Sequence, residues 1–233
     1  MKNVSFGLIA VVLVFGVLFI PKIINKISKK NVVTSNRTIK PGYESLDFIK
    51  LNGIKRKVPD FAFLNQDSIY ITNEDFLGKV YVAEFFFTRC PTICPIMNQN
   101  MKVIYDKFVE RKDFGIASFT IDPDYDRPYI LKKYSEMYVV NSSSWNFLTL
   151  DKEATYKLAN EGFNIFASVN PKVAGGFEHQ GYFALIDKKG YIRSRRDNFG
   201  NPIVYYNGIE KNNSYDGTEN LINDIEKLLN EQK

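Results

Sequence analysis

The run from Val80 to Phe87 constrains the fold of this chain more than any other segment. It is nearly continuous in apolar and aromatic residues, which is typical of a strand that is covered on both of its faces. A segment with apolar residues at helical spacing follows from about Thr92 to Glu110, and a second apolar run extends from Phe114 to Ile121. This order of strand, helix and strand predicts a layered α/β fold.

The remaining periodic segments extend the same pattern. We predict three further helices, over Pro128 to Tyr138, Asp151 to Asn160 with Asp151 as the N-cap, and Thr218 to Leu229. A strand is predicted over Trp145 to Leu150. Two β-hairpins are predicted, an N-terminal one of Phe61 to Leu64 with Ser68 to Thr72 and a later one of Tyr182 to Ile186 with Tyr191 to Arg195. The result is a mixed sheet with helices on both faces. Ligands in such sheets bind beyond the carboxyl ends of the strands, so we expect the site at the loop from Thr88 to Pro95.

The N-terminus has a different composition from the rest of the chain. Residues 3–21 form a run of nineteen without a charge, and a helix of that length spans ~28 Å of hydrocarbon. No small-x-small cleavage motif follows Ile20, so we expect residues 1–21 to remain as a transmembrane anchor. Residues 22–57 are rich in Lys, Asn, Ser and Thr and are interpreted as a basic tether with a short docked piece around Phe48 to Leu51. Residues 58–233 are interpreted as the folded domain.

The net charge of +5 is unevenly distributed along the chain. Residues 22–57 carry +8, whereas residues 58–233 carry −4. The folded part is therefore mildly acidic, which excludes nucleic-acid binding. The basic stretch is interpreted either as attraction to anionic lipid headgroups or as a solvated tether. Because more lysines follow the apolar run than precede it, the positive-inside rule taken alone predicts a cytoplasmic domain.

The only two cysteines, Cys90 and Cys94, lie in the loop after the buried strand. Two thiols four residues apart at a strand-to-helix junction are expected on the same side of the first helical turn, where free amide N–H groups and the helix dipole favour thiolates. Pro91 and Pro95 suit this turn, which does not use its own N–H donors. The pattern indicates metal or redox chemistry, and the alternative is an inert disulfide or two buried small side chains.

Three segments together resemble the Sco/SenC family. They are Phe85 to Pro95, with its Cys-Pro-x-x-Cys-Pro motif, Asp122 to Pro128, and Glu178 to Gln180 ahead of an apolar strand. Members of this family are membrane-anchored, thioredoxin-like copper proteins that assist assembly of cytochrome c oxidase by delivering copper or reducing thiols at its CuA site. The resemblance runs from about Pro59 to Leu229. It implies a single-pass bacterial inner-membrane protein whose thioredoxin-like domain faces the periplasm. This orientation is opposite to the one that the lysine count predicts.

His179 is the only histidine of the chain. The resemblance implies that it is the third copper ligand beside Cys90 and Cys94. Two soft thiolates with one imidazole suit Cu(I), and the imidazole also allows Cu(II) to be held. Glu178 and Gln180 depart from the Asp-His-Ser setting of the family. The implied partners are the CuA-bearing subunit of cytochrome c oxidase and a copper donor or thiol reductant.

An enzyme is the main alternative to a copper-binding assembly protein. A thiol-disulfide oxidoreductase or peroxidase on the same fold would use Cys90 as the nucleophile and Cys94 as the resolving thiol. Three residues separate the cysteines, however, whereas redox pairs usually have two. The proline that thioredoxins place before the later strand is also missing between Glu178 and Tyr182. A Ser-His-Asp hydrolase is set aside because no nucleophile-elbow sequence is present.

Other metals fit less well than copper. Structural zinc needs four ligands, and only three candidates exist. Asp122, Asp124 and Asp126 resemble the start of a calcium loop, but Arg127 and Lys133 stand where that loop needs Gly and Glu. Asp122 and Asp126 therefore either belong to the family segment near the site or begin the turn and helix.

Three further features have a structural and a functional interpretation. Met97 and Met101 fit a core stripe of the helix better than a pair of thioether ligands. Arg89 either lowers the pKa of Cys90 or is solvated. Gly175-Gly176 either lets the His179 loop move or forms an ordinary turn.

Overall fold

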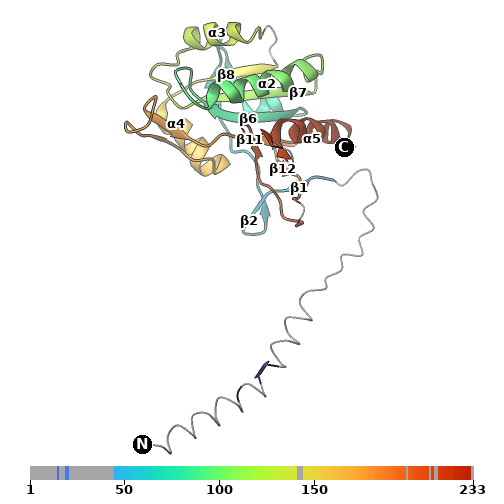
Figure 1. Ribbon diagram of the computed structural model, residues 1–233. Helices are drawn as coiled ribbons and strands as arrows, with labels where there is room; N and C mark the ends of the chain where they lie inside the picture. The colour runs from blue at the N-terminus through green and yellow to red at the C-terminus, as the bar shows by residue number, and fades with distance from the viewer. Residues whose placement is uncertain are drawn as a thin grey trace, which may run out of the picture. The chain divides into compact units, whose positions relative to one another are not determined.

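Strand β6 (Val80–Phe86) lies inside the main sheet of the computed structural model, between β11 (Tyr182–Ile186) and β7 (Phe114–Thr120). Among the described residues this sheet has the order β1-β12-β11-β6-β7-β8, and β13 (Tyr206–Asn207) also pairs with β11. The β6–β7 and β7–β8 pairs are parallel, whereas β11, β12 and β1 add antiparallel (Figure 1). The predicted mixed sheet is confirmed.

The structure describes residues 15, 19–20, 45–140, 144–197, 199–209, 211–212 and 215–231. The chain divides into two units, Met1–Tyr43 and Glu44–Lys233. In the first unit Phe15, Phe19 and Ile20 are helical and exposed, and the two phenylalanine rings stack. No helix among the described residues has the length and hydropathy to cross a membrane. Most of the predicted anchor, residues 3–21, lies outside the described residues.

Every residue of β6 and β7 is buried, as expected for strands covered on both faces. Successive side chains of a strand point to opposite faces, and two neighbours on β6 show what covers each face. The Phe85 ring packs against Phe163 of the π-helix η2 (Leu158–Phe163), whereas the Phe86 ring stacks on Tyr134 of α3 (Pro128–Met137). The predicted helical layers on both faces are therefore present.

The helices and hairpins lie close to their predicted positions. Helix α2 (Cys94–Phe108) begins two residues later than expected, α4 (Lys152–Lys157) has Asp151 as its N-cap and continues into η2, and α5 (Gly217–Asn230) closes the chain. The other elements are β4 (Ala62–Leu64), paired with β5 (Tyr70–Thr72), then η1 (Asn73–Phe76), β8 (Trp145–Leu148), β9 (Ala167–Val169), paired with β10 (Phe177–His179), β12 (Ile192–Ser194), β14 (Lys211–Asn212) and β15 (Tyr215–Asp216).

The folded unit begins earlier than Val58, the start expected from sequence. Strand β1 (Asp47–Phe48) pairs with β12, and β2 (Lys50–Leu51) pairs with β3 (Ile54–Lys55). These residues therefore belong to the fold, and they include the docked piece expected around Phe48 to Leu51 within the segment interpreted as a tether.

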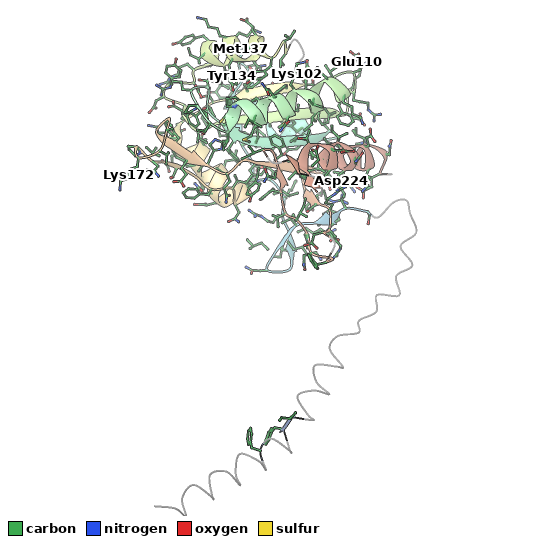
Figure 2. The ribbon with its side chains drawn as sticks, in the orientation of Figure 1. Lys102, Glu110, Tyr134, Met137, Lys172 and Asp224 are labelled. Atoms are coloured by element: carbon green, nitrogen blue, oxygen red, sulfur yellow. The ribbon has the colours of Figure 1, made fainter. Side chains whose placement is uncertain are left out.

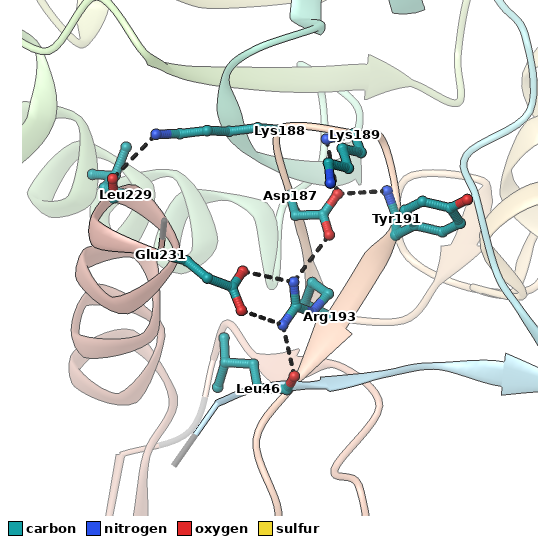
Figure 3. Close-up of polar contacts among 8 residues, drawn as sticks. All are labelled: Leu46, Asp187, Lys188, Lys189, Tyr191, Arg193, Leu229 and Glu231. Carbon is teal, nitrogen blue, oxygen red and sulfur yellow. Dashed lines mark hydrogen bonds and ion pairs between the residues drawn. The ribbon is translucent and has the colours of Figure 1, made fainter. Parts of the chain in front are cut away.

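A buried arginine ties this early segment to the rest of the domain. Arg193 of β12 forms ion pairs with Asp187 at 3.0 Å and with Glu231 at 2.9 Å, and it donates a hydrogen bond to the Leu46 carbonyl at 2.7 Å (Figure 3). Because its guanidinium has five donors in a fixed fork, one side chain joins three segments of the chain. In this way the start of the domain, the β11–β12 turn and the end of α5 are held together.

Candidate metal centre

Cys90, Cys94 and His179 meet beyond the carboxyl end of β6, where the topology predicts a ligand site. Cys90 lies in the loop after β6, Cys94 is the first residue of α2, and His179 is the last residue of β10. The two sulfurs and a ring nitrogen all lie within 4.8 Å of one another. In the part of the chain that the structure describes, no other group of three Cys, His, Asp or Glu side chains is arranged to hold a metal.

The two cysteines are less accessible than the sequence suggests. Cys90 precedes the helix instead of lying within its first turn, and it is 8% exposed, whereas Cys94 is fully buried. A groove of about 220 Å³ gives access to the site; it is lined by Phe87, Cys90, Thr92, Ile93, Val173, Ala174, Phe177, Glu178 and His179. The groove therefore exposes the Cys90 side of the site, whereas Cys94 does not line it.

The two thiols have opposite acid–base properties. The hydrogen bond from the Cys94 thiol lowers the pKa of Cys90 to about 3, with further help from His179 and from the backbone amides of Cys94 and Thr92, while burial acts against it. Burial raises the pKa of Cys94, and the neighbouring Cys90 raises it further. Hydrogen bonds to Cys90 therefore favour a thiolate there, whereas burial keeps Cys94 as the protonated thiol.

The imidazole of His179 presents a ring nitrogen to the sulfurs. Its Nε2 lies 3.2 Å from Cys94 Sγ, and its Nδ1 lies 3.3 Å from the carbonyl oxygen of Gln180. A carbonyl only accepts hydrogen bonds, so Nδ1 is the donor in the contact with Gln180, and Nε2 is the ring atom directed at the sulfurs. A metal-bound imidazole commonly donates its second ring N–H to such a carbonyl, so this arrangement suits a metal held at Nε2.

The residues that flank His179 hold its hairpin in place. Glu178 accepts a hydrogen bond from Asn170 Nδ2 at 2.9 Å, and Gln180 Oε1 accepts one from the Phe166 amide at 3.0 Å. Both hydrogen bonds lie within or beside the hairpin of β9 and β10, and Lys172 lies in the loop that joins these two strands (Figure 2). The two residues that depart from the family pattern, Glu178 and Gln180, therefore form hydrogen bonds that stabilise the hairpin.

Gly175 brings the hairpin against the cysteine loop. It has φ of +87°, and an added Cβ would lie 2.9 Å from the Phe87 ring and 3.0 Å from Pro91 Cδ. The neighbouring Gly176 has φ of +81° but nothing within 4 Å of such a Cβ. The sequence interpretations, loop movement or an ordinary turn, did not include the close approach found at Gly175, whereas Gly176 is an ordinary turn residue.

Asp126 and Asp122 hold the cysteine loop from the other side. Asp126 is fully buried and accepts hydrogen bonds from the Thr88 amide at 3.0 Å, from the Thr88 hydroxyl, and from the Thr120 hydroxyl. Burial raises the pKa of Asp126. Asp122 forms an ion pair with Arg89 at 2.5 Å. The two residues also form the turn before α3, in which the Asp122 carbonyl accepts hydrogen bonds from the amides of Tyr125 and Asp126, so both interpretations left open by sequence apply.

Arg89 is engaged by other side chains, and the two methionines confirm the core interpretation. The Arg89 guanidinium lies 3.9 Å from the centre of the Tyr125 ring as well as beside Asp122, so it is occupied by neighbours other than Cys90. Met97 and Met101 are fully buried in the core. Glu84 escaped the sequence analysis, and the available signal was its position as the one charged residue in an otherwise apolar strand.

A mixed sheet with a dithiol and an imidazole beyond the end of its central strand defines a thioredoxin-like protein with a centre able to hold a metal. The chain belongs to the SCO1/SenC family, whose family model matches residues 50–213.

Individual relatives support this membership. The SCO1 protein homolog of Bacillus subtilis is 32% identical over 172 residues, which cover 72% of this chain and 81% of the relative. The SCO1/SenC family lipoprotein of Bacillus anthracis is 31% identical, with a TM-score of 0.63, over 75% of this chain and 95% of that one. BsSco, a member of the Sco family of cytochrome c oxidase assembly proteins, is 28% identical with a TM-score of 0.63, over 79% and 98%.

A more distant likeness concerns the fold alone. Yeast Sco1 with copper bound is 21% identical to this chain, with a TM-score of 0.56, and the match covers 76% of this chain and 91% of that one. Copper is thus held by a Sco protein of the same thioredoxin-like architecture.

Proposed function

We propose that this chain binds one copper ion through Cys90 Sγ, Cys94 Sγ and His179 Nε2 and assists the assembly of the CuA site of cytochrome c oxidase. The observation that carries the proposal is the convergence of these three atoms within 4.8 Å of one another. Family membership and the relatives with this role support it.

The donor set favours copper over other metals. Thiolates are soft ligands that select Cu(I), and an imidazole allows Cu(II) to be held as well. A structural zinc site is usually completed by four protein ligands, and the described residues offer three here. Both thiols must be deprotonated to bind a metal, so loading displaces the proton that Cys94 keeps in the metal-free protein.

Copper delivery and thiol reduction are both compatible with the site. A thiolate at Cys90 beside a buried second thiol suits thiol-disulfide exchange, in which Cys90 attacks and Cys94 resolves. The His179 imidazole is not needed for that exchange, whereas the proposed copper site loses a ligand without it. We therefore place copper binding first and thiol-disulfide exchange second, with the CuA-bearing oxidase subunit as the target of both. A copper donor would load the site, or a thiol reductant would reduce the cysteine pair, before this chain acts on the oxidase subunit.

Residues 3–21 are proposed to anchor the domain in the bacterial inner membrane, with the domain facing the periplasm. The support is the uncharged run of nineteen residues and the relative that is a lipoprotein. In that compartment disulfides form readily, so the cysteine pair would need a reductant before it could bind copper.

Copper stoichiometry and spectroscopy on the reduced whole chain test the function. We expect one copper per chain, a sulfur-to-copper charge-transfer absorption for Cu(II), and loss of both in Cys90→Ser. Stoichiometric copper in Cys90→Ser would show that the metal site is elsewhere. The control is Ser68→Ala, which removes a hydroxyl from the turn between β4 and β5 and leaves the three ligands in place.

A further inference from the structure

The hairpin of β2 and β3 projects from the rest of the folded unit. Among the described residues these two strands pair only with each other, and a turn of Asn52 and Gly53 joins them. Both turn residues have a positive φ, 51° and 82°, which is typical of the tight two-residue turns of hairpins. Figure 1 shows β2 extending away from the main sheet, beside β1 and β12. The tip of the hairpin therefore lies at the periphery of the domain.

The base of the hairpin is fixed to the domain. The Arg56 amide donates a hydrogen bond to the Ile49 carbonyl at 2.8 Å, and the Ile192 amide of β12 donates one to the Arg56 carbonyl at 3.0 Å. The Arg56 guanidinium donates to the Gly162 carbonyl at 2.6 Å and to the Glu161 carbonyl at 3.1 Å. Because these hydrogen bonds fix the strands, the residues at the tip are presented in one direction.

The tip carries two large apolar side chains that no described residue covers. Leu51 and Ile54 lie directly opposite each other and are 60% and 74% exposed. Opposite residues of an antiparallel pair point to the same face, so the two side chains form one apolar surface. A hairpin of two strands is marginally stable in water unless another surface packs on its apolar face. The tip is therefore suited to contact with something outside the domain.

The other face of the hairpin is positively charged. Lys50 and Lys55 are exposed and also lie directly opposite each other, and like charges in this arrangement destabilise a strand pair. Neither lysine forms an ion pair with any residue that the structure describes. Lys55 Nζ lies 3.6 Å from the centre of the Phe48 ring, which supplies no full negative charge. A negatively charged partner would relieve the repulsion between the two lysines.

An anionic bilayer surface offers both kinds of contact at once. Leu51 and Ile54 adjoin the turn, and each lysine is one residue further from it, which is about 3.3 Å along a strand. A hairpin that enters the bilayer interface by its tip would place the apolar pair beside the acyl chains. The lysines would then lie at the level of the lipid phosphates, which their long side chains can reach.

The place of the hairpin in the chain favours a membrane over a soluble partner. Residues 22–46 lie between the uncharged run, residues 3–21, and the start of β1. This stretch has 25 residues and spans at most about 90 Å even when fully extended. An anchor at residues 3–21 would keep the hairpin within that distance of a bilayer. Even a weak contact is then populated, because it is an intramolecular event.

We propose that the β2–β3 hairpin docks on the surface of an anionic bilayer, with Leu51 and Ile54 in the interface and Lys50 and Lys55 on the lipid phosphates. The proposal rests on the proposed membrane anchor at residues 3–21. It goes beyond that anchor because it assigns the folded domain a membrane contact of its own. Docking would fix which side of the domain faces the bilayer, and so the direction in which the metal centre is presented.

Amine footprinting of the whole chain in lipid nanodiscs tests the contact. The discs contain phosphatidylcholine with or without phosphatidylglycerol, and a water-soluble amine-reactive reagent modifies accessible lysines. Lys50 and Lys55 are expected to react at least about fivefold more slowly in the anionic discs, the factor that corresponds to one lysine at an anionic surface. About 1 M salt should abolish the difference, because the screening length falls to about 3 Å. Exposed Lys133 of α3, which Figure 1 shows across the domain from β2, is the internal control and should react equally in both.

Tryptophan quenching tests whether the tip enters the interface. The only tryptophan, Trp145, is fully buried, so Leu51→Trp adds one reporter at the tip. Lipids brominated on the acyl chains are expected to quench it in the anionic discs. The matched control is Ile69→Trp, at a residue that is 58% exposed between β4 and β5 and should stay unquenched. Adding Lys50→Gln to Leu51→Trp should lower the ratio of docked to free hairpin roughly fivefold.

The outcomes separate the docking from the anchor and from the copper function. A chain that co-elutes with the discs but has the same footprint with and without phosphatidylglycerol overturns the docking and leaves the anchor intact. Protection of Lys50 and Lys55 that appears without discs and grows with protein concentration also overturns it, and assigns the hairpin to a second copy of the chain. A chain that does not co-elute overturns the anchor and the docking together. All measurements are made without metal, so they do not depend on whether the chain binds copper.

Discussion

The Nε2 atom of His179 lies 3.2 Å from the Sγ atom of Cys94, although the two residues are 85 positions apart. The contact joins the end of the β10 strand to the first residue of α2. It places a nitrogen donor and a sulfur donor where one metal ion can contact both.

His179→Ala is expected to weaken copper binding, and to weaken Cu(II) binding more than Cu(I) binding. The reason is that Cu(II) depends more on nitrogen donors, whereas two thiolates alone suit Cu(I). Competition titrations with chelators for each oxidation state measure the effect, with Glu178→Gln as the adjacent control. Disulfide formation between Cys90 and Cys94 is expected to persist. Unchanged copper affinity together with lost thiol exchange would show that the site is an oxidoreductase centre instead.

The two cysteine-to-serine variants are expected to differ in stability although both lose tight copper binding. Cys94 is fully buried, so a serine hydroxyl there lowers the free energy of unfolding by about 1–3 kcal/mol. Cys90 is at the groove, and its replacement is expected to cost less. Urea unfolding with a reductant and a chelator measures both. An equal cost for the two variants would contradict the assigned burial.

Gly175→Ala is expected to destabilise the protein more than Gly176→Ala. Both alanines would have to adopt a positive φ, which costs roughly 1–2 kcal/mol at either position. Only the Cβ at Gly175 would also press on Phe87 and Pro91, and displacing that loop should lower copper affinity as well. Thermal unfolding and copper titration of the matched pair decide the point. The close-approach interpretation fails if the two variants behave alike.

Glu84→Gln is expected to remove a pH dependence of stability. Burial raises the pKa of Glu84 from 4.5 to about 7 in the folded state. Its favourable contribution is therefore fully present below about pH 4.5 and is lost as the pH rises through about 7, a change of about 3 kcal/mol. Relative to wild type, the glutamine variant should gain stability by that amount between about pH 5 and pH 8. Glu226→Gln, at an exposed ion pair with Lys107, is the control and should show no such trend.

The domain is expected to face the periplasm, and reporter fusions test this orientation. Alkaline phosphatase joined after Lys233 should be active, because that enzyme needs the oxidising periplasm. Deleting residues 1–21 should abolish its export. A fusion that is active only for a cytoplasmic reporter would support the orientation indicated by the lysine count.

The main sheet and its helices were predictable because their signals are local. The apolar run at β6, the helical spacing in α2 and the aspartate at the start of α4 each indicate their element without reference to distant residues. Before Val58 the sequence indicated only a short docked piece around Phe48 to Leu51, because the strands there are two residues long and have no periodicity. Their place depends on partners far along the chain, among them Arg193.

The sequence by itself determined the α/β class, the loop that carries the site, and, through the family resemblance, the three candidate ligands. Only the tertiary structure decided that Cys94 is buried, that Asp126 holds Thr88, that Gly175 lets the hairpin approach Phe87, and that Glu84 is an uncompensated acid in the core. The physical reason is that residue type and spacing report local backbone preference. Burial, pKa and hydrogen-bond partners depend instead on groups that come together only when distant segments pack.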